Sequence, residues 1–213
     1  MKKIKVAILG SGNIGTDLLV KIMRSPFLEN SVFIGRSLNS NGLQKAQSLG
    51  VPISTESIGH IIKNPSCCDI VFDATSAKSH IEHAAILKDL GKFVVDLTPA
   101  KIGEMCVPAV NMDECVNEVN VNMVTCGGQA SIPIAYAIGQ THDDVDYIEV
   151  VSSIASRSAG PATRLNLDEY IHTTESGVKK FSGAKRTKAI LNLNPALPCI
   201  DMQTTILAKV DKP

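Results

Sequence analysis

Residues 4–15 read IKVAILGSGNIG. The first half of this stretch, Ile4 to Leu9, is apolar and rich in β-branched residues, which predicts a buried strand. The second half has glycines at positions 10, 12 and 15, and the overlapping run from Asn13 to Met23 has helical spacing. Glycines with this spacing allow a tight turn, close approach of a pyrophosphate to the backbone, and close packing of helix on strand. Because a helix N-terminus also favours an anion, the stretch predicts a dinucleotide-binding turn, against the alternative of a βα turn without a ligand.

Strand-like and helical segments alternate from this turn to about residue 125. Strand-like composition is found in Ile4–Leu9, Val32–Ile34, Val51–Ile53, Asp69–Asp73, Phe93–Leu97 and Val119–Thr125. Helical spacing is found in residues 13–23, 41–49, 55–63 and 79–90. The last of these opens on the capping-box spacing of Ser79 and Glu82. Strands that alternate with helices indicate βαβ units, so residues 1–125 are expected to form a Rossmann-type parallel-sheet domain of the α/β class.

The pattern changes after Cys126. Helical spacing is found at 127–139 and 166–181, strand-like composition at 145–155, 189–193 and 204–210, and loop composition at 157–164. The first helix is expected to carry Pro133 in its opening turns, and the second to have a cap at Asn166 and Glu169. The strand at 145–155 has the character of an antiparallel strand. Residues 126–213 are therefore expected to form a separate α+β domain.

The composition excludes several classes of protein. The chain has 213 residues, 44% of them hydrophobic, and its 21 basic and 21 acidic residues cancel to zero net charge. A neutral chain without a large basic block argues against nucleic-acid binding. No apolar run approaches the roughly 18 residues of a membrane helix, and Ile4–Leu9 is too short for a signal-peptide core. We therefore expect a cytoplasmic protein whose six cysteines stay reduced.

One cysteine stands apart from the others. Cys126-Gly127-Gly128 lies between an expected strand and an expected helix, at the carboxyl edge of the sheet. The helix N-terminus stabilises a thiolate there, and the two glycines leave backbone N–H groups that suit an oxyanion. Spacing alone leaves two interpretations open, a nucleophile or an inert buried cysteine. The remaining cysteines form no CxxC pair and are expected to be small buried hydrophobic residues: Cys67, Cys68, Cys106, Cys115 and Cys199.

The end of the second strand leaves the choice of cofactor open. A carboxylate there binds both ribose hydroxyls of NAD, but the sequence reads Gly35-Arg36-Ser37. Arg36 either pairs with the 2′-phosphate of NADP, or stacks on the adenine of NAD, or is a surface arginine.

The histidines are not expected to hold a metal. His80 and His83 share a helix face, but no third ligand is in sight. His60, His142 and His172 stand alone in polar surroundings, so exposure to solvent is expected for them.

Residues 122–130 read NMVTCGGQA. At this segment the chain resembles the acylating, CoA-dependent acetaldehyde dehydrogenases. The family's other landmarks are matched by Gly10–Gly15, Asp73–Ser76, Asp96–Ala100, Ser158–Arg164 and Asn194–Ala196, so that the resemblance covers essentially the whole chain.

The resemblance implies a two-step reaction with NAD as cofactor, NADP remaining open, and coenzyme A as co-substrate. Cys126 would attack acetaldehyde or another short-chain aldehyde, pass through a thioester, and release the acyl group to CoA. Ser11, Gly12, Asn13 and Ile14 would hold the pyrophosphate. A second segment would close over the cofactor: Ser158, Ala159, Gly160, Pro161, Ala162, Thr163, Arg164, Leu165 and Asn166. The resemblance also implies a homo-oligomer, a dimerising and catalytic second domain, and a 4-hydroxy-2-oxovalerate aldolase as partner.

Two departures from the family qualify this expectation. Thr204 stands where the family carries an aspartate that helps the catalytic cysteine, and Asp201 is three positions away, on the opposite face of a strand. Family members also continue well beyond Pro213, so a C-terminally incomplete second domain is expected. Two alternatives therefore remain: a phosphate-dependent semialdehyde dehydrogenase, and a catalytically inactive NAD-binding partner subunit.

Overall fold

The computed structural model describes residues 2–212, apart from the side chain of Ala162. The chain forms two compact units. The N-terminal unit comprises the chain up to Thr98 together with Ile102–Glu104 and Asn117–Asn122. The C-terminal unit comprises Pro99–Lys101, Met105–Val116 and the chain from Met123 onwards. The crossing from one unit to the other is therefore spread over residues 99–123.

The N-terminal unit is built on a seven-stranded sheet with the order β3-β2-β1-β4-β5-β7-β6. Its strands are β1 (Ile4–Leu9), β2 (Leu28–Ile34), β3 (Ile53–Ser54), β4 (Ile70–Asp73), β5 (Phe93–Asp96), β6 (Glu104–Met105) and β7 (Asn120–Asn122). The pairings of β2 with β3, of β1 with β2 and β4, and of β5 with β4 and β7 are all parallel. The expected Rossmann-type sheet is confirmed.

Helices cover both faces of this sheet. They are α1 (Asn13–Arg24), α2 (Asn41–Ser48), α3 (Gly59–Lys63), the 3-10 turn η1 (Pro65–Cys67) and α4 (Ala77–Asp89). Side chains of β1 alternate between two apolar clusters. Val6 and Ile8 pack with residues of α1 and α2, whereas Ala7 and Leu9 pack with residues of α3 and α4. This alternation, which follows from the two-residue period of a strand, produces a sheet buried on both faces.

Two helix starts in this unit differ from the expectation. The helix expected over 55–63 begins only at Gly59, because Ser57 has φ = 53° and the residues before Gly59 form a turn. The helix expected to be capped at Ser79 begins at Ala77 instead. Ser76 is its N-cap, because Ser76 has an extended backbone and its hydroxyl accepts a hydrogen bond from Ser79 N at 3.2 Å.

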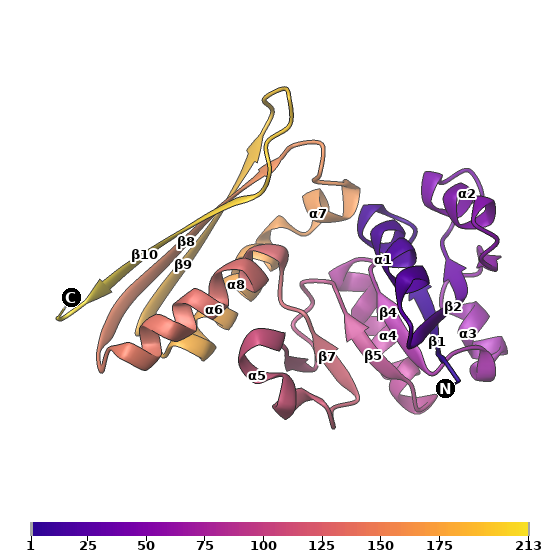
Figure 1. Cartoon of the computed structure of the whole chain (residues 1–213), viewed down its shortest axis with the longest axis horizontal. Coiled ribbons are helices and arrows are strands. Elements are labelled where there is room, and N and C mark those ends of the chain that lie inside the picture. The colour runs from indigo at the N-terminus through magenta and orange to yellow at the C-terminus, as the bar shows by residue number, and fades with distance from the viewer. Residues whose placement is uncertain (1, 213) are drawn as a thin grey trace. The chain divides into compact units, whose positions relative to one another are not determined.

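The C-terminal unit is a three-stranded sheet with two long helices. The order β10-β8-β9 places β8 (Val145–Ala155) between β9 (Arg186–Asn194), which is parallel to it, and β10 (Gln203–Val210), which is antiparallel. The helices are α5 (Pro108–Cys115), α6 (Cys126–Thr141), α7 (Pro161–Leu165) and α8 (Leu167–Ser182). Figure 1 shows α6 and α8 side by side along one face of this sheet, where their apolar side chains form a core with those of β8.

Several local expectations for this region were wrong. Pro133 lies inside α6, with seven helical residues before it, because the helix begins at Cys126. The segment expected to be a loop at 157–164 contains most of α7, a short helix that begins at Pro161, where proline is favoured. Neither β6 nor α5 was expected, since Glu104–Met105 is too short, and Pro108–Cys115 too irregular, to show a period.

The cysteines other than Cys126 are not all buried. Cys68, Cys106 and Cys115 are buried as expected, and Cys67 is half-buried. Cys199 is exposed, which contradicts the expectation, because it lies in the connection between β9 and β10 rather than in a core-facing element.

No helix among residues 2–212 combines the length and the apolar character that crossing a bilayer requires.

Candidate functional site

The turn after β1 has the backbone that a dinucleotide turn requires. Gly10 has φ = 107°, and a Cβ on it would collide with the carbonyl oxygen of Ala74. A Cβ on Gly15 would collide with the carbonyl oxygen of Gly10. By contrast, a Cβ on Gly12 would meet nothing within 4 Å. The first and third glycines are thus required for packing, while the second faces open space, where a ligand can approach the backbone.

The N-terminus of α1 remains available to an anion. Its N-cap is Gly12, which offers no capping side chain, and the first turn contains no acidic residue. Gly12, Asn13 and Ile14 are exposed, and Ser11 is half-buried with its hydroxyl 3.1 Å from that of Ser40. These residues form one continuous exposed turn. Their free helical N–H groups suit a pyrophosphate, so the turn fits the cofactor that the sequence predicts.

The sheet order places this turn at a topological switch point. β1 lies between β2 and β4, where the strand order reverses, and ligands of open α/β sheets bind in the crevice at such points. Gly10 N bonds to Ile34 O, and Ala74 N bonds to Leu9 O, so the loops after β1, β2 and β4 meet there. Arg36 follows β2 on the surface, a position compatible with each of its three interpretations.

Beneath this edge of the sheet is a buried network of carboxylates and imidazoles that the sequence did not reveal. Asp73 Oδ2 lies 2.9 Å from His80 Nδ1 and 2.8 Å from His83 Nδ1. The other nitrogen of His80, Nε2, lies 3.3 Å from Oδ2 of Asp96. The two histidines thus contact carboxylates. Within the described part of the chain no cluster of three or more His, Cys, Asp or Glu side chains suits a metal ion.

The two carboxyl groups of this network have opposite pKa shifts. Burial disfavours the ionised form of Asp73, but hydrogen bonds from His80 and His83 outweigh that effect and hold the pKa of Asp73 well below its usual range. Burial raises the pKa of Asp96 to about 6, against the opposing influence of His80. Asn122 donates a hydrogen bond to Asp96 Oδ2 at 2.7 Å.

In the C-terminal unit, Cys126 is the first residue of α6, and its side chain is exposed. The N-cap is Thr125, whose hydroxyl accepts a hydrogen bond from Gly128 N at 2.9 Å and lies 2.7 Å from the hydroxyl of Thr174 on α8. Val124 has φ = 58°, a left-handed conformation that is strained for a β-branched residue. The strained turn and the capped helix together present the sulfur at the helix N-terminus, where a thiolate is stabilised.

Tyr170 on α8 is the side chain that meets this cysteine. Its hydroxyl oxygen lies 3.7 Å from Cys126 Sγ and accepts a hydrogen bond from Gly127 N at 3.0 Å. Burial, followed by the neighbouring charge and hydrogen bond of Cys126, raises the pKa of Tyr170 far above its ordinary value. Tyr170 therefore holds its phenolic proton more strongly than an exposed tyrosine does.

The two glycines after Cys126 are required for this arrangement. A Cβ on Gly127 would collide with the Tyr170 hydroxyl and would lie 2.7 Å from Ser152 Oγ. A Cβ on Gly128 would lie 2.7 Å from Val124 Cγ1. The absence of a side chain at Gly127 thus allows the phenol to reach the backbone N–H of that residue, and its absence at Gly128 leaves space for Val124.

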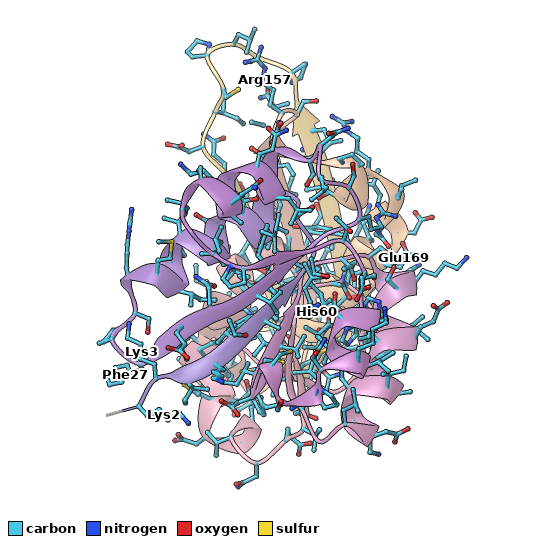
Figure 2. The ribbon with its side chains drawn as sticks, turned by 90° about the vertical axis from the view of Figure 1, so that its right-hand side faces the viewer. Lys2, Lys3, Phe27, His60, Arg157 and Glu169 are labelled. Atoms are coloured by element: carbon cyan, nitrogen blue, oxygen red, sulfur yellow. The ribbon has the colours of Figure 1, made fainter. Side chains whose placement is uncertain are left out.

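The second expected cofactor segment is a turn followed by α7. Ser158, Pro161, Arg164 and Leu165 are exposed, Gly160 and Thr163 half-buried, and Ala159 and Asn166 buried; the Ala162 side chain lies outside the described residues. Arg164 folds back on its own segment, donating from Nε to Ala159 O at 3.0 Å and from Nη2 to Ser156 O at 2.9 Å. Figure 2 shows Arg157 at the surface of this turn and Glu169 at the surface of the first turn of α8.

This segment leads directly to the environment of Cys126. Asn166 is the N-cap of α8, as expected, but without a capping bond from its side chain. Its carbonyl oxygen accepts a hydrogen bond from Tyr170 N at 2.9 Å. One helical turn therefore separates the end of the segment from the hydroxyl that contacts the cysteine.

Thr204, at the position where the family's aspartate is expected, has a buried hydroxyl. Thr204 on β10 is the cross-strand partner of Ser152 on β8, and both hydroxyl oxygens are buried without a hydrogen-bond partner among the described residues. Asp201 is exposed and precedes β10, which begins at Gln203. The expectation that Asp201 lies on the opposite face of the strand is thus wrong, because Asp201 is not in the strand.

Sequence reasoning missed Tyr170, Ser152 and Thr174 as neighbours of the cysteine. The available signal was weak: Tyr170 and Thr174 are four residues apart and share one face of an amphipathic helix, the face that is buried. Nothing in the local pattern shows that this face meets the start of α6.

Comparison with known proteins identifies the family of both units. Residues 5–135 match the family described as "Semialdehyde dehydrogenase, NAD binding domain", and residues 126–213 match "Prokaryotic acetaldehyde dehydrogenase, dimerisation". Among solved structures, aspartate semialdehyde dehydrogenase from Candida albicans with NADP is similar with a TM-score of 0.72 at 14% identity, over 100% of this chain and 73% of the other. At that identity the likeness shows the fold alone.

Sequence relatives are much closer. The acetaldehyde dehydrogenase of Spirochaeta aurantia is 65% identical over 100% of this chain and 71% of the relative. That of Pectobacterium atrosepticum is 62% identical over 100% of this chain and 72% of the relative. Both matches extend over the two units of the chain. On this ground the chain belongs to the acetaldehyde dehydrogenase family.

Proposed function

We propose that this chain oxidises acetaldehyde with NAD and transfers the acyl group to coenzyme A through a thioester on Cys126. The observation that carries the proposal is the exposed thiol at the capped N-terminus of α6, within a chain that belongs to the acetaldehyde dehydrogenase family. A helix N-terminus stabilises the thiolate, which is the nucleophilic form of cysteine. The turn from Ser11 to Ile14 holds the cofactor pyrophosphate on its exposed N–H groups.

The reaction follows from these residues in two stages. The Cys126 thiolate attacks the aldehyde carbon, forming a C–S bond and converting the carbonyl oxygen to an alkoxide. When bound, NAD supplies the acceptor for the hydride that leaves this carbon. The carbonyl then re-forms as a thioester, the thiolate of CoA attacks it, and the bond to Cys126 breaks, regenerating the enzyme thiolate. In sum, aldehyde, NAD⁺ and CoA–SH become acyl-CoA, NADH and H⁺.

Backbone groups of the C-terminal unit support the charge that develops. The sequence suggested that the N–H groups after Cys126 would hold the alkoxide oxygen, but those of Gly127 and Gly128 already donate to the Tyr170 hydroxyl and to Thr125 Oγ1. The positive end of the α6 dipole, at which Cys126 stands, therefore supports the alkoxide charge. The segment from Ser158 to Asn166 is proposed as the second cofactor-binding segment. Its own hydrogen bonds through Arg164 organise it without a ligand.

Assembly and partners follow the same reasoning. The match of residues 126–213 to a dimerisation family supports a homo-oligomer. An aldolase that supplies the aldehyde directly is proposed as partner, because a volatile, reactive aldehyde favours transfer without release.

One assay tests the proposal. Purified protein is mixed with acetaldehyde and either NAD or NADP, with CoA, with phosphate in its place, or with neither, and nicotinamide reduction is followed. We expect CoA-dependent reduction with NAD that Cys126→Ala lowers by about 10³-fold or more, as expected for loss of a covalent nucleophile. Cys199→Ala, the matched change at the other exposed cysteine, should leave the rate unchanged.

The remaining outcomes identify the alternatives. Phosphate-dependent reduction would point to a semialdehyde dehydrogenase with phosphate as acyl acceptor. Cofactor binding without reduction under any condition would point to a catalytically inactive partner subunit. Faster reduction with NADP than with NAD would assign Arg36 to the 2′-phosphate.

A further inference from the structure

Cys126 and Tyr170 are 44 residues apart in the chain, yet their sulfur and hydroxyl oxygen are separated by 3.7 Å. We propose that Tyr170 is a positioning residue for the reacting thiolate, whose hydroxyl donates a hydrogen bond to Cys126 Sγ while it fixes the N–H of Gly127. The inference rests on the proposed function of Cys126 as nucleophile. It adds a residue that neither the GxGxxG turn nor the cysteine motif contains.

The hydrogen-bond directions follow from the contacts. Gly127 N–H donates to the Tyr170 oxygen at 3.0 Å, so this oxygen already serves as an acceptor. The hydroxyl proton then remains for a second partner, and the Cys126 sulfur lies within reach. Burial keeps the phenol protonated, and a nearby thiolate strengthens that preference. A neutral phenol beside a thiolate is a charge-assisted donor, which is the stronger class of hydrogen bond.

The surroundings hold the hydroxyl in this place. Tyr170 is 7% exposed and α8 continues with Thr174, whose hydroxyl meets the N-cap of α6 at 2.7 Å. Gly127 has no Cβ, which leaves the space that the hydroxyl occupies. A phenylalanine ring would fill the same site equally well, so packing alone does not account for the hydroxyl.

The neighbouring hydroxyl groups of Ser152 and Thr204 bring no charge to the site. Ser152 opposes the rise in the pKa of Tyr170, although Ser152 Oγ has no hydrogen-bond partner among the described residues. Its cross-strand partner Thr204 is also a buried hydroxyl without a partner among the described residues. Among the hydrogen bonds described for residues 2–212, the contact with the Tyr170 hydroxyl is the one that involves Cys126 Sγ. The thiolate is therefore stabilised by a neutral donor and by the start of α6.

The test is the pH dependence of alkylation of the full chain by iodoacetamide, with the label on Cys126 quantified by peptide mass spectrometry. In Tyr170→Phe we expect the midpoint of the pH profile for Cys126 alkylation to rise by about one pH unit. Below the midpoint the reaction should be roughly tenfold slower, in line with the loss of one charged hydrogen bond. The exposed Cys199 serves as reference on the same molecule. Tyr147→Phe is the matched control, because Tyr147 bonds to Glu149 instead.

Each outcome decides the inference. An upward shift confined to Cys126 in Tyr170→Phe supports it, whereas identical profiles in Tyr170→Phe and the unmodified chain overturn it. If Tyr170→Phe fails to fold, Gly127→Ala tests the same contact, because its methyl group displaces the hydroxyl without removing it. The same shift is then expected, and its absence overturns the inference.

Alkylation needs no aldehyde, cofactor or CoA, so the two proposals fail in different ways. CoA-dependent turnover without a shift in Tyr170→Phe refutes the positioning role alone. A shift in a protein that shows no turnover refutes the proposed function and leaves the hydrogen bond in place.

Discussion

At the scale of single residues, the environment of Cys126 combines strain and close contacts. Val124 has φ = 58° while its side chain is 1% exposed in the core of the C-terminal unit. Such a conformation costs about 1–3 kcal/mol and persists only where the surroundings impose it. Packing of Val124 against Gly128 and Gly177 is one such constraint. The left-handed conformation at Val124 turns the chain from the end of the sheet into the helix that presents Cys126.

Gly127→Ala tests the close contact at this turn. The new methyl group would collide with the Tyr170 hydroxyl, so we expect the free energy of unfolding to fall by about 1–3 kcal/mol, the usual cost of overpacking. Urea denaturation gives this value. In the Tyr170→Phe background the same change should cost less, because the hydroxyl is gone. Gly59→Ala is the control, since a Cβ there meets nothing within 4 Å. Equal costs in the two backgrounds would contradict the contact.

At the scale of elements, α6 and α8 contact each other at the site of Cys126. The N-cap of α6 shares its hydroxyl contact with Thr174 of α8, and Tyr170 is one turn earlier on α8. Gln129 adds hydrogen bonds from Nε2 to the carbonyl oxygens of Cys106 and Met123 at 2.7 and 2.9 Å. The start of α6 is therefore attached both to α8 and to the chain that precedes it.

Thr125→Ala removes the cap of α6. Gly128 N loses its acceptor, and we expect the free energy of unfolding to fall by about 1 kcal/mol, the typical cost of losing an N-cap. Thermal unfolding measures the effect, and Thr125→Ser, which keeps the hydroxyl, should be nearly neutral. Alkylation of Cys126 should also slow, because the helix start that stabilises the thiolate frays. An unchanged melting temperature in Thr125→Ala would show that the cap contributes nothing.

At the scale of the whole molecule, each unit brings one part of the chemistry. The N-terminal unit has the parallel order and the open glycine turn of a dinucleotide-binding sheet. It also contains the buried network in which α4 contacts the ends of β4 and β5. The C-terminal unit contains the cysteine. The network belongs to the first unit and has its own pH dependence.

Asp96→Asn tests that pH dependence. Burial raises the pKa of Asp96 to about 6, so between about pH 4 and 6 the folded chain retains a proton that the unfolded chain has released. The pKa shift of Asp96 therefore costs no stability below pH 4, where both states are protonated, and its cost grows through this window to about 3 kcal/mol above pH 6. Denaturant unfolding at several pH values should show the variant gaining relative to the unmodified chain as pH rises from 4 to 6.

The groups that face Asp96 are the same in both proteins apart from this change. They are His80 on α4, Asn122 on β7, and the hydroxyl and backbone N–H of Thr98, with Asp73 on the far side of His80. The pH dependence that Asp73 adds to stability has the opposite sign. Because its pKa is lowered, its stabilising contribution is lost as pH falls below the ordinary aspartate pKa. A variant-minus-parent difference that does not change between pH 4 and 6 would refute the assignment to Asp96.

The amino-acid sequence by itself determined the elements whose signals are local. The strand Ile4–Leu9, the turn with its glycines, the helix after it and the strand Val145–Ala155 were predicted with nearly their observed bounds, because periodicity and turn chemistry act over a few neighbouring residues. The placement of Cys126 at the start of a helix was predicted for the same reason. The role of Cys126 and the cofactor residues remain predictions.

Only the tertiary structure decided which side chains meet. Tyr170 reaches Cys126 because α8 packs against α6, and Asp73 contacts His80 and His83 because α4 returns over the ends of the strands. Exposure of Cys199, the cap at Ser76 and the left-handed Val124 likewise depend on how the elements meet. Helix and strand periods arise from neighbouring residues, whereas burial and hydrogen bonding arise from contacts between residues far apart in the chain, which local patterns do not encode.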